Sequence, residues 1–70
     1  MDARTFFQNN PKTRVEAVAK KAGTTYGNFQ QIAMYNGAVS RKLAKALAEA
    51  SDNEMTIMEI LFPNESVAAG

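Results

Sequence analysis

The stretch RVEAVAKKAGTTYGNFQQIAMYN, residues 14–36, decides the fold of this chain. Its first part is apolar at positions i, i+3, i+4 and i+7, a spacing that forms one stripe along a helix. That stripe consists of Val15, Val18, Ala19 and Ala22. The second part places Phe29, Ile32 and Ala33 on the inner side of another helix. The pattern therefore predicts two short helices that pack against each other.

The segment AGTT, residues 22–25, ends the first of these helices and starts the second. Gly23 can take the positive φ of a helix C-cap at low cost. The Thr25 hydroxyl can then cap the following helix. Because the connection is short, we expect the helices to cross steeply rather than lie antiparallel. This is the helix-turn-helix arrangement, whose second helix enters the DNA major groove.

These residues resemble the helix-turn-helix of phage Cro and repressor proteins. Ala19 lies four residues before the turn glycine, Gly23, and a hydroxyl residue, Thr25, opens the second helix. Phe29 and Ile32 fall where that family packs its second helix on the first. The resemblance implies binding to double-stranded DNA, with the second helix reading the bases.

A second resemblance covers nearly the whole chain. The order of segments is similar to that of small all-helical Cro-like phage proteins. It consists of a first helix, the Arg/Lys-rich helix-turn-helix, SRKLAKA at residues 40–46 and MTIMEIL at residues 55–61. Thr24 departs from the pattern, since the family usually has valine or isoleucine there, although Thr can still bury its methyl group. The resemblance implies an all-α, lambda-repressor-like domain of five short helices, the second and third forming the helix-turn-helix.

The composition indicates one small domain without catalytic or metal-binding side chains. Seventy residues make one domain, which we assign to residues 1–62, with residues 63–70 as a flexible tail. There is no Cys, so a disulfide, a thiolate metal site and a cysteine nucleophile are missing. There is no His, which removes the commonest general base and transition-metal ligand. We therefore expect no metal, no cofactor and no enzymatic activity. The chain has no apolar signal core and no membrane span, so we expect a cytoplasmic protein of a bacterial host cell.

The net charge of +1 conceals a division along the chain. Residues 1–45 hold all eight basic residues and two acids, whereas residues 46–70 hold five acids and no base. Such polarity indicates one face for an anionic partner and another for solvent or a second protein. A chance division of a solvated surface is the plainer interpretation, but the basic part coincides with the predicted helix-turn-helix.

Capping residues and apolar spacing place the helices and the core. The predicted helices cover residues 3–9, 14–22, 26–35, 41–50 and a short fifth segment between 56 and 62. The expected caps are Asp2, Thr25 and Ser40, with capping boxes at Thr13–Glu16 and Thr56–Glu59. The expected core is Phe6, Val15, Val18, Ala19, Ala22, Phe29, Ile32, Leu43, Ala46, Leu47, Ile57, Ile60 and Leu61.

The outer side of the third helix is polar and predicts a base-reading surface. The candidates are Thr25, Tyr26, Gly27, Asn28, Gln30, Gln31 and Tyr35. Side-chain amides bond bidentately to adenine N6 and N7, and we expect Gln31 with Asn28 as close partners and Gln30 as the alternative. No Lys or Arg occurs from Thr24 through Val39, so base reading depends on amides and apolar contacts. A neutral solvent face is the plainer interpretation.

Basic and hydroxyl residues at two helix starts are candidates for phosphate contacts, because free N–H groups and the helix dipole favour an anion there. They are Lys12, Thr13, Arg14, Ser40, Arg41 and Lys42. Phage operators are usually pseudo-palindromes read by two copies. We therefore expect a weak homodimer, or one that forms only on DNA, with Met58 or Phe62 available for the contact.

The leading hypothesis is a sequence-specific transcriptional regulator that blocks transcription from a phage or prophage operator. The alternative keeps the fold but uses the acidic C-terminal half to bind a protein, as in an antitoxin or adaptor. Salt-sensitive binding to duplex DNA separates the two.

Overall fold

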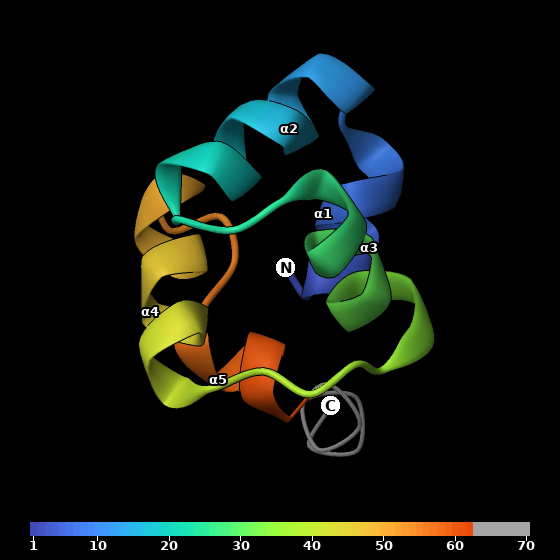
Figure 1. Ribbon diagram of the computed structural model, residues 1–70. Coiled ribbons are helices and arrows are strands. Elements are labelled where there is room, and N and C mark those ends of the chain that lie inside the picture. The colour runs from blue at the N-terminus through green and yellow to red at the C-terminus, as the bar shows by residue number, and fades with distance from the viewer. Residues whose placement is uncertain (63–70) are drawn as a thin grey trace.

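In the computed structural model, which describes residues 1–62, the chain forms five α-helices and no strand (Figure 1). They are α1 (Ala3–Asn9), α2 (Lys12–Lys21), α3 (Tyr26–Tyr35), α4 (Arg41–Ala50) and α5 (Ile57–Leu61). α3 packs against α1 and α2, and α4 packs against α2 and α5. No helix of this part of the chain is long and apolar enough to cross a membrane. The predicted all-α fold of five helices is confirmed, and the predicted tail lies outside the described residues.

Four helices begin at the side-chain caps that the sequence predicts. The caps are Asp2, Thr25, Ser40 and Thr56, each accepting a hydrogen bond from the backbone N–H three residues later. Thr56 and Glu59 complete the predicted capping box. The hydrogen bond from Thr5 also lowers the pKa of Asp2. Each cap stabilises its helix by about 1 kcal/mol, which matters in a domain with such short helices.

The predicted capping box at Thr13–Glu16 is wrong. α2 begins two residues earlier, and its N-cap is Pro11, which makes no side-chain cap. The Pro11 carbonyl accepts hydrogen bonds from Arg14 N (3.0 Å) and Val15 N (3.1 Å), so the helical ladder already includes Thr13. A proline fixes its own φ near −65° and has no N–H to satisfy, which suits a helix entrance. Thr13 is consequently an exposed first-turn residue.

Left-handed residues end α2 and α3 where the sequence predicts. Gly23 has φ 85°, and Thr24 N donates to the Ala19 carbonyl at 2.9 Å, which closes α2. Asn36 has φ 53° at the end of α3, and Gly37 N donates to the Gln31 carbonyl at 2.7 Å. A Cβ on Gly37 would lie 3.0 Å from the Gln31 carbonyl atoms, which is tighter than most real contacts, so a larger residue there would require the chain to shift.

Aromatic rings from α1 and α3 form one side of the core. Phe6 and Phe29 are fully buried with ring centroids 6.3 Å apart, and Phe7 meets Phe29 edge-to-face at 5.7 Å. Met55, just before α5, is also fully buried. Of the predicted core, Val15, Val18, Ala19, Phe29, Ile32, Leu47, Ile60 and Phe6 are buried. The others, Ala22, Leu43, Ala46, Ile57 and Leu61, are only partly buried.

The buried side of α4 agrees only in part with the expected stripe of Leu43, Ala46, Leu47 and Ala50, of which Leu47 and Ala50 are buried. Ala44, Leu47, Ala48 and Ser51 are buried at i, i+3, i+4 and i+7, whereas Leu43 and Ala46 lie at the boundary. Alanine is so frequent in this helix that two neighbouring stripes fit the same periodicity. Ser51 continues the buried stripe because its Oγ donates to the Ala48 carbonyl (2.9 Å) and accepts from Met55 N (3.1 Å).

Close approach of α2 to its neighbours requires a small residue at position 19. Ala19 is completely buried, so we expect Ala19→Leu to overpack the core and reduce the free energy of unfolding by about 1–3 kcal/mol. Urea unfolding measures this change. Ala17→Leu, at an exposed position of the same helix, is the control and should have little effect. Equal stability of the two variants would contradict the packing described here.

Candidate nucleic-acid interface

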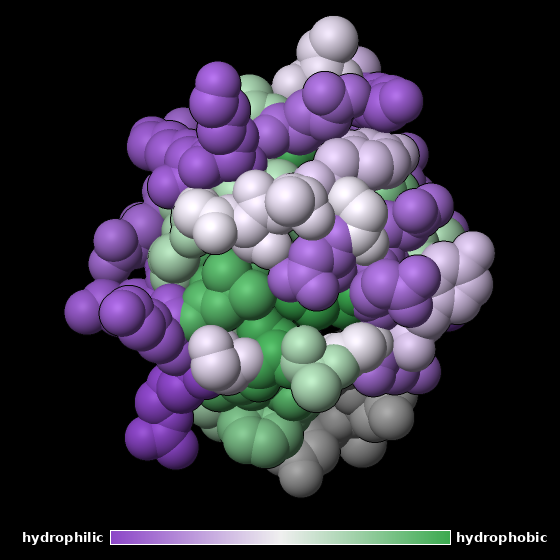
Figure 2. Space-filling model, in the orientation of Figure 1, coloured by the Kyte–Doolittle hydropathy of each residue, from purple (hydrophilic) through white to green (hydrophobic). Residues whose placement is uncertain are grey.

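The residues of α3 that are predicted to read bases divide into an exposed and a half-buried group. Gly27, Asn28, Gln31 and Tyr35 are exposed and share one side of the helix. Tyr26 and Gln30 are half-buried and lie one turn apart on its flank. Thr25 is exposed at the cap. The name "exposed amide face" is used below for Gly27, Asn28, Gln31 and Tyr35. Figure 2 shows hydrophilic atoms at the top and left of the molecule, where Figure 1 places α2 and α4.

The turn before α3 fixes the side chain of Asn28. Asn28 Nδ2 donates to Thr24 Oγ1 at 2.8 Å, and Asn28 N donates to Thr25 Oγ1 at 3.1 Å. One amide proton of Asn28 is therefore engaged, while Oδ1 and the second amide proton remain available. Thr24 was expected only to bury a methyl group. Its spacing of four residues from Asn28 across a helix start is the sequence signal that could have identified this contact.

Gln31 combines an anchored backbone with an available side chain. Its carbonyl oxygen accepts hydrogen bonds from the N–H groups of Asn36 and Gly37, which end α3. Its side-chain amide is exposed and makes no hydrogen bond within residues 1–62. A rigid backbone that carries a free amide is suited to directional hydrogen bonding with a ligand.

Gly27 has no role in packing. A Cβ at this position would meet no atom within 4 Å, and φ does not require glycine. Glycine inside a helix nevertheless costs about 1 kcal/mol relative to alanine. The residue therefore weakens α3 without any benefit to the fold among the described residues, which is typical of a position where something outside the chain approaches the backbone.

The predicted base reader Tyr26 packs against the predicted phosphate contact Lys12. The Tyr26 ring lies 5.3 Å from the Phe7 ring, and Lys12 Nζ is 5.2 Å from the Tyr26 centroid. This cation–π contact joins α2 to α3 and contributes about 0.5–1 kcal/mol at an exposed site. Both residues thus have a structural contact besides the one predicted from sequence.

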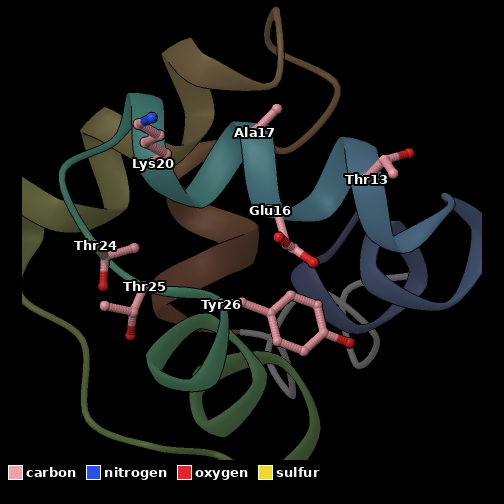
Figure 3. A pocket seen from close by; sticks show the side chains of 7 residues that line it. All are labelled: Thr13, Glu16, Ala17, Lys20, Thr24, Thr25 and Tyr26. Atoms are coloured by element: carbon pink, nitrogen blue, oxygen red, sulfur yellow. The ribbon is translucent and has the colours of Figure 1, made fainter.

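An open cleft of about 350 Å³ separates α2 from the start of α3 (Figure 3). Its lining consists of Thr13, Glu16, Ala17, Lys20, Thr24, Thr25 and Tyr26. Glu16 extends from α2 toward the Tyr26 ring, and its Oε1 is 3.9 Å from Lys12 Nζ. A carboxylate in the middle of this cleft disfavours a phosphate there. Anion contacts are therefore expected outside this cleft, at the first turns of α2 and α4.

The first turn of α4 is one of these two places. Ser40 caps the helix, no acidic residue lies in its first turn, and Arg41 and Lys42 are exposed. The backbone N–H groups of Arg41 and Lys42 have no acceptor within the helix. In Figure 1 the first turn of α2 lies above α3, and the first turn of α4 lies at the lower left of the view. Exposed cationic groups are thus available at the first turn of α4, and Lys12 is exposed at the first turn of α2.

A second cleft, of about 340 Å³, has no charged group in its lining. It lies beside the connection from α3 to α4 and includes Ile32, Val39, Ile60 and Leu61. Apolar atoms are visible next to this connection in Figure 2. Since no cationic side chain lines this cleft, it is not included in the candidate interface.

Arg14, a predicted phosphate contact, is engaged within the protein. Its guanidinium donates to Asn10 Oδ1 and Glu54 Oε2 and lies 5.1 Å from the Phe6 centroid. The hydrogen bond between Arg14 and Glu54 lowers the pKa of Glu54 and raises the pKa of Arg14. Arg14 therefore connects the α1–α2 junction to the turn before α5.

No family model, curated protein or solved structure matches this chain. The functional assignment therefore depends on the side chains that the five helices bring together.

The pair between Arg14 and Glu54 predicts acid-dependent stability. Because pairing lowers the pKa of Glu54 below its unfolded value, its contribution is present at neutral pH and is lost as the pH falls through the lowered pKa. Glu54→Gln should therefore lower the Tm at neutral pH and have little effect in strongly acidic buffer. Thermal unfolding by circular dichroism measures both.

Glu49→Gln is the matched control, because Glu49 is exposed and makes no ion pair within residues 1–62. A Tm difference between wild type and Glu54→Gln that stays constant with pH would contradict a stabilising pair.

Proposed function

We propose that this chain is a sequence-specific double-stranded DNA-binding transcriptional regulator of the phage Cro and repressor type. In this proposal α2 and α3 form the helix-turn-helix of a lambda-repressor-like domain, and α3 lies in the major groove. The observation that carries it is the combination of the uncharged, hydrogen-bonding exposed amide face of α3 with the exposed cationic residues Arg41 and Lys42 at the capped start of α4. Contacts to phosphate position a protein on DNA, whereas contacts to base edges specify the sequence.

The connection between α2 and α3 supports this proposal. Gly23 ends α2 in a left-handed conformation, Thr25 caps α3, and Ala19 is fully buried. Together these features hold α3 by one side and leave the other side to solvent. A helix presented in this way has the shape that the major groove, about 12 Å wide, admits.

The apolar residues left exposed on the C-terminal side suit a second copy. Met58 is 61% exposed and Phe62 is 42% exposed. Two copies would place their recognition helices about 34 Å apart, in successive major grooves. So small an apolar surface is consistent with a weak homodimer, or with one that forms only on DNA. Stoichiometry measured by analytical ultracentrifugation, with and without a duplex, tests this part of the proposal.

The alternative, a protein-binding module such as an antitoxin or adaptor, has less support. It requires the acidic C-terminal half as its binding surface. Glu54 pairs with Arg14, and Glu59 accepts hydrogen bonds from Thr56 and the Met1 amino group. Two of the four acids described in this half are therefore engaged within the chain, which leaves little negative surface for a partner.

We predict that Arg41→Ala and Lys42→Ala each weaken binding to specific and random duplexes alike. Each lost phosphate contact should lower the salt dependence, the slope of log K against log[salt], by about 0.9. Fluorescence anisotropy with a labelled duplex, measured over a salt series, gives these slopes. Lys45→Ala, one turn later on the same helix, is the control and should leave the slope nearly unchanged.

Failure of the wild-type protein to bind any duplex in a salt-dependent manner would rule out the proposed function. If binding occurs but neither Arg41→Ala nor Lys42→Ala changes the slope, the start of α4 does not contact phosphate and the docking orientation is wrong.

A further inference from the structure

We infer that the exposed amide face reads adjacent A·T base pairs, with Asn28 and Gln31 as the adenine-reading residues and Thr24 as a positioning residue. This inference rests on the proposed function and specifies its ligand. It concerns which base pairs α3 recognises and how one amide is held in the orientation that recognition needs.

The chemistry of the face favours adenine over guanine. In the major groove, guanine presents two acceptors, N7 and O6, which are best matched by the paired donors of Arg. Adenine presents one acceptor, N7, and one donor, N6–H, which are matched by the donor and acceptor of a single amide. Since no Lys or Arg occurs from Thr24 through Val39, the face can match only the second pattern bidentately.

The spacing of the two amides suits neighbouring base pairs. Asn28 and Gln31 are three residues apart and both exposed, so they lie on the same side of α3. Three residues advance about 4.5 Å along a helix, close to the spacing of about 3.4 Å between successive base pairs. A helix that lies along the groove would thus present one amide to each of two successive pairs.

The Thr24 hydroxyl gives Asn28 its orientation. It accepts one amide proton of Asn28 at 2.8 Å and leaves Oδ1 and the other amide proton for adenine N6–H and N7. Without this contact the exposed amide would rotate freely, and its ordering would have to accompany binding. Valine has nearly the same shape as threonine but cannot accept the amide proton. Thr24→Val therefore removes the hydrogen bond to Asn28 while it keeps the packing of residue 24.

Gly27 provides room beside the two amides. It is exposed, and a Cβ there would meet no atom of the protein within 4 Å. The thymine partner of each adenine projects a C5-methyl group into the major groove. An absent side chain next to Asn28 and Gln31 lets the helix backbone approach that methyl group closely.

The first test selects bound sites from random duplexes and then replaces adenines by 7-deazaadenine, which lacks the N7 acceptor. We expect the selected half-sites to contain adjacent A·T pairs. One 7-deazaadenine at a read position should weaken wild-type binding about tenfold, with no change in binding to random DNA. Gln31→Ala should remove the sensitivity at one position, whereas Gln8→Ala, at an exposed position of α1 outside the interface, should retain it.

The second test examines the positioning role of Thr24. Thr24→Val should weaken binding to the selected site several-fold and abolish the effect of 7-deazaadenine at the position read by Asn28, while leaving the Tm unchanged or higher. Thr24→Ser, which keeps the hydroxyl, should restore both. Gly27→Ala should raise the Tm and yet weaken binding to the selected site.

The outcomes of these tests separate failure of the adenine-reading inference from failure of the proposed DNA-binding function. If the protein binds duplexes with salt dependence but selects G·C pairs, the adenine-reading inference is wrong and the proposed function stands. If it binds every duplex equally, the sequence-specific part of the proposed function fails together with the inference. If Thr24→Val binds the selected site like wild type, Thr24 does not position Asn28. If no duplex is bound at all, the proposed function fails as well.

Discussion

The contact around Ala19 is the constraint on which the rest of the structure depends. Its methyl group is completely buried, and its carbonyl accepts the Thr24 N–H that closes α2. The same residue therefore allows close approach of neighbouring helices and directs the chain into the turn. Because Thr24 and Thr25 are positioned by this turn, the cap of α3 and the hydrogen bond to Asn28 depend on it too. A larger side chain at position 19 would move the exposed amide face as well as the core.

Some basic residues of the N-terminal part make contacts within the protein and others are exposed, and composition alone does not distinguish the two groups. Arg14 is bound by Glu54 and Asn10, and Lys12 lies over Tyr26. Arg41 and Lys42, by contrast, are exposed at a capped helix start without an acidic neighbour in that turn. A charge of +6 over residues 1–45 therefore overstates what is available to an anionic partner. The distinction depends on contacts between residues up to 40 positions apart, which a local pattern cannot reveal.

The sequence predicts α3 and α4 to the residue because both ends carry strong local signals, a hydroxyl cap before the first residue and a left-handed or turn residue after the last. It fails at the start of α2, where the carbonyl of Pro11 replaces the expected Thr13 cap. It is also only partly right about the buried stripe of α4, because Leu47 and Ala50 are buried as expected, whereas Leu43 and Ala46 lie at the boundary and Ala44 and Ala48 are buried instead. In the candidate site, exposure of Asn28 and Gln31 agrees with prediction, whereas the contacts of Tyr26, Lys12 and Thr24 come from the folded structure.

Gly27 shows why a binding surface is easier to recognise in the folded structure than in the sequence. In the sequence it is one weak helix former among polar neighbours. In the structure its surroundings are empty and its φ is ordinary, so neither packing nor backbone geometry explains it. A glycine at the second position of this helix of ten residues is a poorer helix former than alanine and makes no packing contact in return among the described residues. Selection for binding is a sufficient cause, since natural proteins retain locally unfavourable residues mainly where function requires them. The neighbouring amides, one held by Thr24 and one without a hydrogen bond among the described residues, are the groups that would meet a base-pair edge if α3 binds DNA as proposed.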